Sequence, residues 1–133
     1  MSEIEKTFGK VIHTYTRSQA IEDGVLIEVS EIAKEAGIRL PTALTAGVWG
    51  KYVTIPSGVV GQDEVGRLWD ILYMFRMSTY QFQYRYASDT ILFRLHVRND
   101  NRPGIPPLIT LKAICGPGDK GAPVLTIMLP DED

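Results

Sequence analysis

The chain has 133 residues, of which 44% are hydrophobic and 23% charged, and its formal net charge is -2. A chain of this size folds as one domain, residues 1–133, that buries ~65 to 70% of its unfolded surface. A single cysteine excludes an internal disulfide, and no apolar run reaches the ~18 residues needed to cross a bilayer. The first residues also lack the apolar core of a signal peptide, so we expect a cytoplasmic protein without a membrane partner.

The first third of the chain carries start and stop signals for two short helices with a strand between them. Thr16 and Gln19 have the spacing of a capping box, and Gly24 can end that helix. The string VLIEV at 25–29 then predicts a buried strand. A second helix is expected to begin at Ser30 and to end at Gly37.

Two further helices are predicted in the middle of the chain. Thr42 can cap a helix that runs through residues 43–53, although this helix contains two glycines. Residues 54–61 read as a loop, and a longer helix follows at 63–79. Val65, Leu68, Trp69 and Leu72 recur there at the spacing of one helix face, so we expect Trp69 to be buried with the others.

The second half changes from the period of a helix to that of a strand. Alternating apolar residues predict strands at 80–86 and 91–98, joined as a hairpin, and two more strands at 108–115 and 124–130. Residues 99–107 are rich in Pro, Gly and Asn and read as an exposed loop. The predicted fold class is α+β, with helices of the N-terminal half packed on one face of a four-stranded, mainly antiparallel sheet formed by the C-terminal half.

Three strings in the chain are similar to a known group of proteins. YTRSQAIEDGVLIEVS near the start, GRLWDIL in the middle and GPGDKGAPVLTIMLP at the end resemble a family of small bacterial proteins with a domain of unknown function. This family occurs on chromosomes, plasmids and phages and has no established activity, so the resemblance carries over no catalytic residue. It implies an accessory protein of mobile elements, a class that often binds host defence proteins or their nucleotide signals.

Basic residues gather in the second half of the chain. Residues 80–115 carry 5 Lys and Arg against 2 Asp and Glu, whereas residues 116–133 carry 1 against 4. Alternation places most of these cations on the polar face of the predicted sheet, where like charges repel unless an anion lies across them. Without aromatic side chains on that face, stacked nucleic-acid bases are not favoured. The candidate binding residues are Arg85, Arg94, His96, Arg98, Arg102 and Lys112.

The alternative function is enzymatic. His13 ends the apolar string VIH ahead of a helix and a glycine, which resembles the first motif of ADP-ribosyltransferases, where such a histidine binds the ribose of NAD. Those enzymes also use a catalytic acid on a later strand, and the sequence has no Glu between Glu64 and Glu132. A strand-end histidine without a chemical role is the competing interpretation.

Two other features of the sequence resemble chemical sites. Cys115 ends a predicted strand with neither histidine near it in sequence, so a small apolar role is expected rather than a nucleophile or a zinc ligand. GPGDKG resembles a phosphate loop but lacks the Ser or Thr after its Lys, and it reads as a hairpin turn. The sequence therefore favours a non-catalytic protein without a cofactor or metal. It would bind a host protein or an anionic nucleotide ligand through a basic sheet face.

Overall fold

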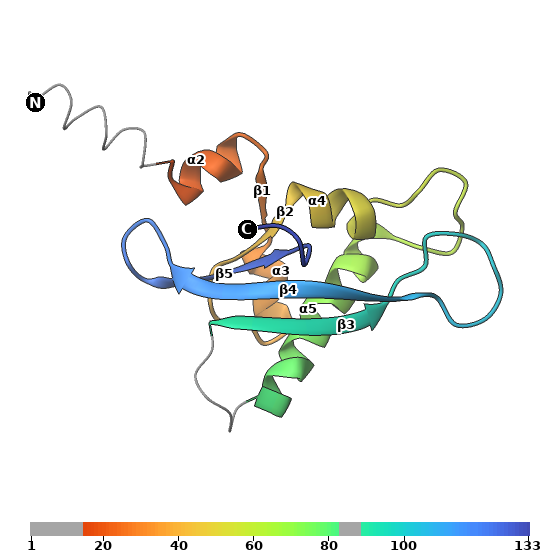
Figure 1. The fold of residues 1–133 in the computed structure, drawn as a ribbon. Coiled ribbons are helices and arrows are strands. Elements are labelled where there is room, and N and C mark those ends of the chain that lie inside the picture. Colours follow the sequence, from red (N-terminus) through yellow and green to blue (C-terminus); the bar gives the residue numbers. More distant parts are fainter. Residues whose placement is uncertain (1–14, 83–88) are drawn as a thin grey trace, which may run out of the picture.

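A computed structural model describes residues 15–82 and 89–133, which build a mixed sheet with short helices around it (Figure 1). Within these residues the sheet has five strands in the order β1-β2-β5-β4-β3. Neighbouring strands run antiparallel, except that β2 and β5 are parallel. The strands are β1 (Leu26–Glu28), β2 (Thr42–Thr45), β3 (Thr90–His96), β4 (Leu108–Pro117) and β5 (Pro123–Met128).

Four short helical segments precede or follow the first two strands, and one long helix lies in the middle of the chain. The longest, α5, contributes most of the helical surface in the core. The others are one or two turns long. Their bounds are α2 (Arg17–Glu22), α3 (Ser30–Glu35), α4 (Ala46–Val48), the π-helical turn η1 (Trp49–Val53) and α5 (Glu64–Phe82).

The two predicted N-terminal helices are present. Thr16 and Gln19 form the expected capping box of α2, in which the Thr16 hydroxyl accepts from the Gln19 amide and the Gln19 side chain accepts from the Thr16 amide. Both helices end at glycines with positive φ, Gly24 at 78° and Gly37 at 92°. A side chain at such a backbone conformation is strained, which explains the stop signals.

The strand expected at 25–29 forms β1, but it lies at the edge of the sheet and is not fully buried. Val25 is 50% exposed, and of the strand residues Leu26 and Ile27 are half-buried. The chain then turns through α3 and returns as β2, which pairs with β1. The Ser30 hydroxyl accepts the Thr42 amide at 2.9 Å and so ties the start of α3 to the start of β2.

The helix predicted from Thr42 is wrong at its first four residues, which form β2. Thr42, Ala43 and Leu44 are completely buried between β1 and β5, and this burial outweighs their local preference. Helix α4 begins four residues later, where the Thr45 hydroxyl accepts from the Val48 amide. Strand β2 was not predicted from the sequence. Its parallel pairing with β5 makes the sheet mixed.

The strand predicted at 80–86 is wrong at residues 80–82, the part of it that the structure describes. Helix α5 continues to Phe82, and residues 83–88 lie outside the described residues. Arg76 lies 4.6 Å from the centre of the Tyr80 ring, one helical turn away, so Tyr80 belongs to the helix surface. The partner of β3 is therefore β4, with Phe93 opposite Leu111.

One hydrophobic core lies between the sheet and the helices α3 and α5, which lie behind the sheet in Figure 1. On β3 the alternation is as predicted, since Phe93, Leu95 and Val97 are buried. Completely buried residues come from every layer. They include Leu44, Ile71, Leu72, Leu111 and Ile127.

The predicted α+β class and the mainly antiparallel sheet are confirmed, whereas a four-stranded sheet formed by the C-terminal half alone is wrong, because β1 and β2 of the N-terminal half belong to it. The helices do not all cover one face either. Arg17 of α2 donates to the hydroxyl of Thr126 at 2.7 Å, and Thr126 points away from the core that its neighbours Leu125 and Ile127 enter. We call this side, opposite α3 and α5, the outer face. In the described part of the chain, no helix has the length and apolar character to cross a membrane.

Candidate functional site

The predicted binding residues begin on strand β3. Because successive side chains of a strand point to opposite faces, burial of Phe93 and Leu95 places Arg94 and His96 on the outer face. Both are exposed. Among the described residues, nothing forms a hydrogen bond or an ion pair with the Arg94 side chain, so its guanidinium is available to a partner.

Arg98 has a structural task at the end of this strand. Its guanidinium donates through Nη1 to the carbonyl oxygen of Arg102 and through Nη2 to that of Gly104. These bonds close the loop 99–107 around one side chain. Both acceptors are neutral, and the loop is therefore stabilised without cancelling the charge of Arg98.

His96 supports the other end of the same loop. Its Nδ1 lies 2.7 Å from the carbonyl oxygen of Pro106. A carbonyl oxygen only accepts, so Nδ1 carries the proton, and in the neutral ring Nε2 is left as an acceptor. The imidazole is thus fixed in one tautomer and one orientation at the edge of the basic surface.

A second loop holds the first in place. Asn101 donates to the carbonyl oxygen of Gly58 at 2.9 Å and accepts from the Val60 amide at 3.0 Å. Asn99 also donates to the carbonyl oxygen of Lys51 at 3.0 Å. Loop 99–107 is therefore joined to the segment 51–60, and Arg102 at its tip is 88% exposed with Asp100 at 4.0 Å.

Beneath these loops lies a small polar pocket that the sequence did not reveal. Its lining combines residues of η1, α5 and β3 and includes two of the predicted binding residues. The polar residues that line it are Tyr52, Gln62, Arg67, Asp70, His96 and Arg98.

Arg67 is the least expected member of this pocket, because it is only 6% exposed. It donates to the carbonyl oxygen of Arg98 at 2.6 Å and to Oδ1 of Asn99 at 2.7 Å, and it also contacts the carbonyl oxygens of Val53 and Thr54. Burial lowers the pKa of the guanidinium, while the charge of Glu64 acts in the opposite direction. In the sequence, the available signal for this role was the position of Arg67, a charged residue on an apolar face of the predicted helix.

Asp70 lies one turn further along α5. Asp70 is exposed as a residue, and the partial desolvation of its carboxyl raises its pKa, as does the negative charge of Asp63. The pocket thus holds two ionisable groups, Arg67 and Asp70, whose surroundings disfavour their charged forms. Such groups cluster at binding sites, and they also occur in structural networks.

The remaining predicted residues are not part of this arrangement. Lys112 lies on the outer face of β4, opposite Leu92 on one side and Met128 on the other, and its Nζ donates to the backbone oxygen of Glu132. Arg85 and His13 lie outside the described residues. The structure therefore joins Arg98 to the loop of Arg102, with His96 at the other end of that loop. Arg94 lies two residues before His96, and Lys112 is its diagonal neighbour on β4, held by its bond to Glu132.

The string GPGDKG and Cys115, the two other features of the sequence, both belong to the hairpin of β4 and β5. The string GPGDKG turns the chain from β4 to β5, as predicted, because Pro117 lies opposite Pro123 in the hairpin. Asp119 in this turn accepts the amides of Arg17 and Ser18 at 2.7 and 3.0 Å, so it caps helix α2. Cys115 is half-buried opposite Leu125. In the described part of the chain, no three His, Cys, Asp or Glu side chains are grouped to hold a metal ion.

Comparison with known proteins adds one result. The model of a family described as a family of unknown function (DUF6573) matches residues 5–133. The chain belongs to this family. Searches of curated proteins and of solved structures each returned no match. Family membership confirms the resemblance found in the three sequence strings, and it assigns no role to any residue.

Proposed function

We propose that this protein is a non-catalytic binding protein. It holds an anionic partner with the outer face of β3, near the C-terminal end of that strand, and with the loop 99–107. The observation that carries the proposal is the exposed Arg94 guanidinium, which no described residue engages. It lies two residues from His96, whose ring is fixed by Pro106. A cation without a competing partner breaks no existing bond when an anion docks, and the cost of docking is the ordering of its own side chain.

The loop beyond the strand supports the same reading. Arg98 is neutralised by no carboxylate among the described residues, and Arg102 extends from a loop fastened by Asn99 and Asn101. Cations on a rigid surface attract an acidic surface or a phosphate group. The partner is a host protein, including a defence protein, or an anionic nucleotide ligand. The setting is that of a cytoplasmic accessory protein of phages and other mobile elements.

Affinity capture from a host lysate tests the proposal, with bound proteins and nucleotides identified by mass spectrometry. Arg94→Glu should abolish capture of an anionic partner, and Arg102→Glu should reduce it. Arg39→Glu is the matched control, since it reverses another exposed arginine, in the segment between α3 and β2. Retention of the partner by Arg94→Glu at wild-type level would overturn the proposal.

Salt provides an independent measurement. Screening shortens the reach of exposed charges from ~8 Å at physiological ionic strength to ~3 Å at 1 M, so capture through Arg94 should fall as salt rises. The enzymatic alternative centred on His13 stays a prediction, because that residue lies outside the described residues. His13→Ala leaves capture unchanged if the binding proposal holds.

A further inference from the structure

A cleft of about 500 Å³ opens at the other end of the sheet, away from Arg94. Small-molecule sites typically measure ~300 to 1,000 Å³, so the cleft is large enough for a small ligand. Helix α2 and the turn after it form one wall, and the start of α4 with the C-terminal segment forms the other. Its lining comprises Ala20, Gly24, Val25, Leu26, Thr45, Ala46, Gly47, Thr126, Met128, Glu132 and Asp133.

The walls of the cleft are built from small residues. Ala20 and Gly24 line one side, and Ala46 and Gly47 line the other. At Gly47 even one added carbon would lie 3.0 Å from Cδ1 of Leu129 and 3.2 Å from Oε2 of Glu132. Glycine therefore lets the C-terminal segment pack closely against α4, which places Glu132 at the cleft.

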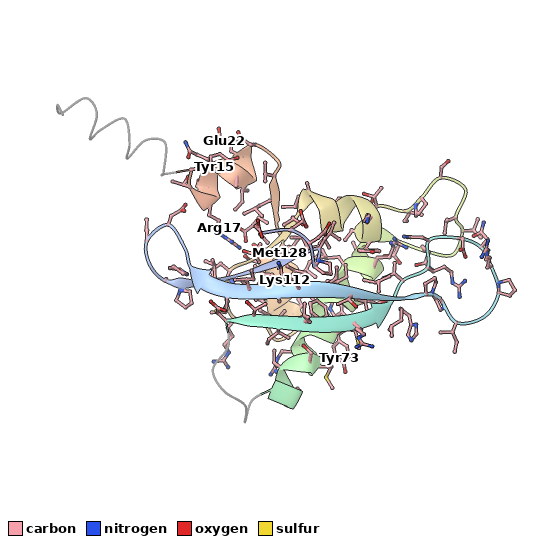
Figure 2. All side chains as sticks on the ribbon, viewed as in Figure 1. Tyr15, Arg17, Glu22, Tyr73, Lys112 and Met128 are labelled. Carbon is pink, nitrogen blue, oxygen red and sulfur yellow. The ribbon has the colours of Figure 1, made fainter. Side chains whose placement is uncertain are left out.

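The cleft offers an apolar surface beside these walls. Val25 is 50% exposed at its rim, and Leu26 is half-buried on the outer face of β1, whereas Met128 of β5 is only 5% exposed and forms the floor. Figure 2 shows Met128 on the sheet below α2, with Arg17 between them. An alkyl chain lying on Val25 and Leu26 would remove apolar area from water, at ~25 cal/mol per Å².

The charge of the cleft is negative. Oε1 of Glu132 accepts from the Thr45 hydroxyl and from the Leu129 amide, both at 2.7 Å, which fixes the carboxylate. Lys112 donates to the backbone oxygen of Glu132 and not to this carboxylate. Among the described residues, neither Glu132 nor the exposed Asp133 forms an ion pair. The Lys112 ammonium lies beside the backbone of Glu132, so one cation faces two carboxylates and the cleft keeps a negative charge.

A second cation near the cleft, Arg17, is engaged elsewhere. Arg17 donates through Nη1 to Thr126 Oγ1 and through Nη2 to the carbonyl oxygen of Leu125, both at 2.7 Å. The attraction of Glu28 and Asp119 acts on the same guanidinium. Its hydrogen-bonding groups are thus directed into the sheet, whereas the carboxylate of Glu132 lines the open cleft.

We infer that this cleft binds a small organic cation, an ammonium or guanidinium group carried on an alkyl body. The charged group lies against the carboxylate of Glu132, and the body lies on Val25 and Leu26, above the buried Met128. The fixed carboxylate supplies a charge-assisted hydrogen bond, and the small wall residues leave room for the chain. The site is separate from the basic surface around Arg94.

Titration of the isotope-labelled protein with hexylammonium, followed by amide chemical shifts, tests this inference. The chemical shift changes should saturate with hexylammonium and should map to residues 20–26, 45–47 and 126–133. Hexanol and hexanoate, which have chains of the same six carbons, should give much weaker changes. Glu132→Gln keeps an acceptor oxygen for Thr45 and Leu129. It should weaken the affinity for hexylammonium by about tenfold, which corresponds to the loss of one charge-assisted hydrogen bond.

Two more variants complete the test. Ala46→Trp places a large side chain at an exposed cleft position and should abolish binding, whereas Asp131→Asn removes an equal charge outside the lining and should not alter it. Arg94→Glu should also leave amine binding unchanged, which separates this site from the proposed function. Equal shifts with hexanol, or wild-type affinity in Glu132→Gln, would overturn the inference.

Discussion

Arg67 donates through Nη1 to the backbone carbonyl oxygen of Arg98 at 2.6 Å, so one arginine fixes the backbone of another. The same guanidinium reaches Val53, Thr54 and Asn99. A single buried side chain of α5 thereby joins the end of β3 to the segment after η1. The exposed cations of the basic surface depend on this connection for their positions.

We expect Arg67→Met to lower the free energy of unfolding by about 3 kcal/mol or more, because several buried acceptors lose their donor at once. Arg67→Lys should restore little, since an ammonium group cannot reach four acceptors on two sides. Urea unfolding measures both variants. Arg39→Met at an exposed position is the control, and a similar small loss in all three proteins would contradict the role given to Arg67.

Asp119 caps helix α2 from a turn that is 102 residues away in sequence from Arg17. Removal of this cap in Asp119→Ala should cost about 1 to 2 kcal/mol and should speed amide exchange in α2, since two amide donors lose their acceptor. Asp119→Asn retains one acceptor oxygen and should be milder. Unchanged exchange of the Arg17 and Ser18 amides in Asp119→Ala would show that the contact contributes nothing.

The apolar face of α5 is not uniformly buried. Leu72 is completely buried, whereas Val65 is 62% exposed and Trp69 is half-buried, stacked on Tyr73 with ring centres 5.0 Å apart. Leu72→Ala should therefore cost ~2 to 5 kcal/mol, and Val65→Ala less than ~0.5 kcal/mol. Trp69→Ala should fall between them. Thermal unfolding of the three variants gives the ranking, and a loss at Val65 as large as at Leu72 would contradict it.

Asp70 gives the protein a predictable response to pH. Its folded-state pKa is raised, so the ionised carboxylate costs stability at neutral pH, and this cost disappears as the pH falls through the folded-state pKa toward the unfolded value of ~3.9. Asp70→Asn should be more stable than the wild type at pH 7, and the difference should shrink in acid. Chemical unfolding at both pH values measures it, and a difference that grows in acid would reverse the assignment.

Arg94 and Arg98 should respond differently to charge reversal, although they lie four residues apart on the same strand and its extension. Arg94→Glu should leave the melting temperature unchanged, because its side chain has no bond to lose among the described residues. Arg98→Glu should lower it, since the carbonyl oxygens of Arg102 and Gly104 lose their donors. Calorimetry separates the two, and equal melting temperatures would show that loop closure does not depend on Arg98.

Local signals predicted the parts of the fold that depend on local interactions. The capping box of Thr16 and Gln19, the glycine at position 24 and the alternation on β3 act within a few residues, and the structure contains all three. Strand β2 was missed because its conformation is set by burial between β1 and β5. Those neighbours lie far from it in sequence, and no nearby residue reveals them.

The candidate site was predicted less completely for the same reason. Arg94 and His96 were assigned to the outer face from strand alternation, and both lie there. Arg67 and Asp70 line the pocket because α5 packs on β3. This packing joins segments that are distant in sequence, so no local pattern predicts it. The structural duties of Arg98 and Lys112 were also unforeseen, because their acceptors are backbone oxygens that carry no side-chain signature.

The position of β5 determines when the sheet can be completed during synthesis. Strands β1 and β2 pair with each other early in the chain, and β3 pairs with β4 later, but these two hairpin-like units meet through β5. Residues 123–128 leave the ribosome after all of them. Until then Leu44 and Leu111 lack the strand that lies between β2 and β4, so the nascent chain exposes apolar surface that a chaperone can recognise.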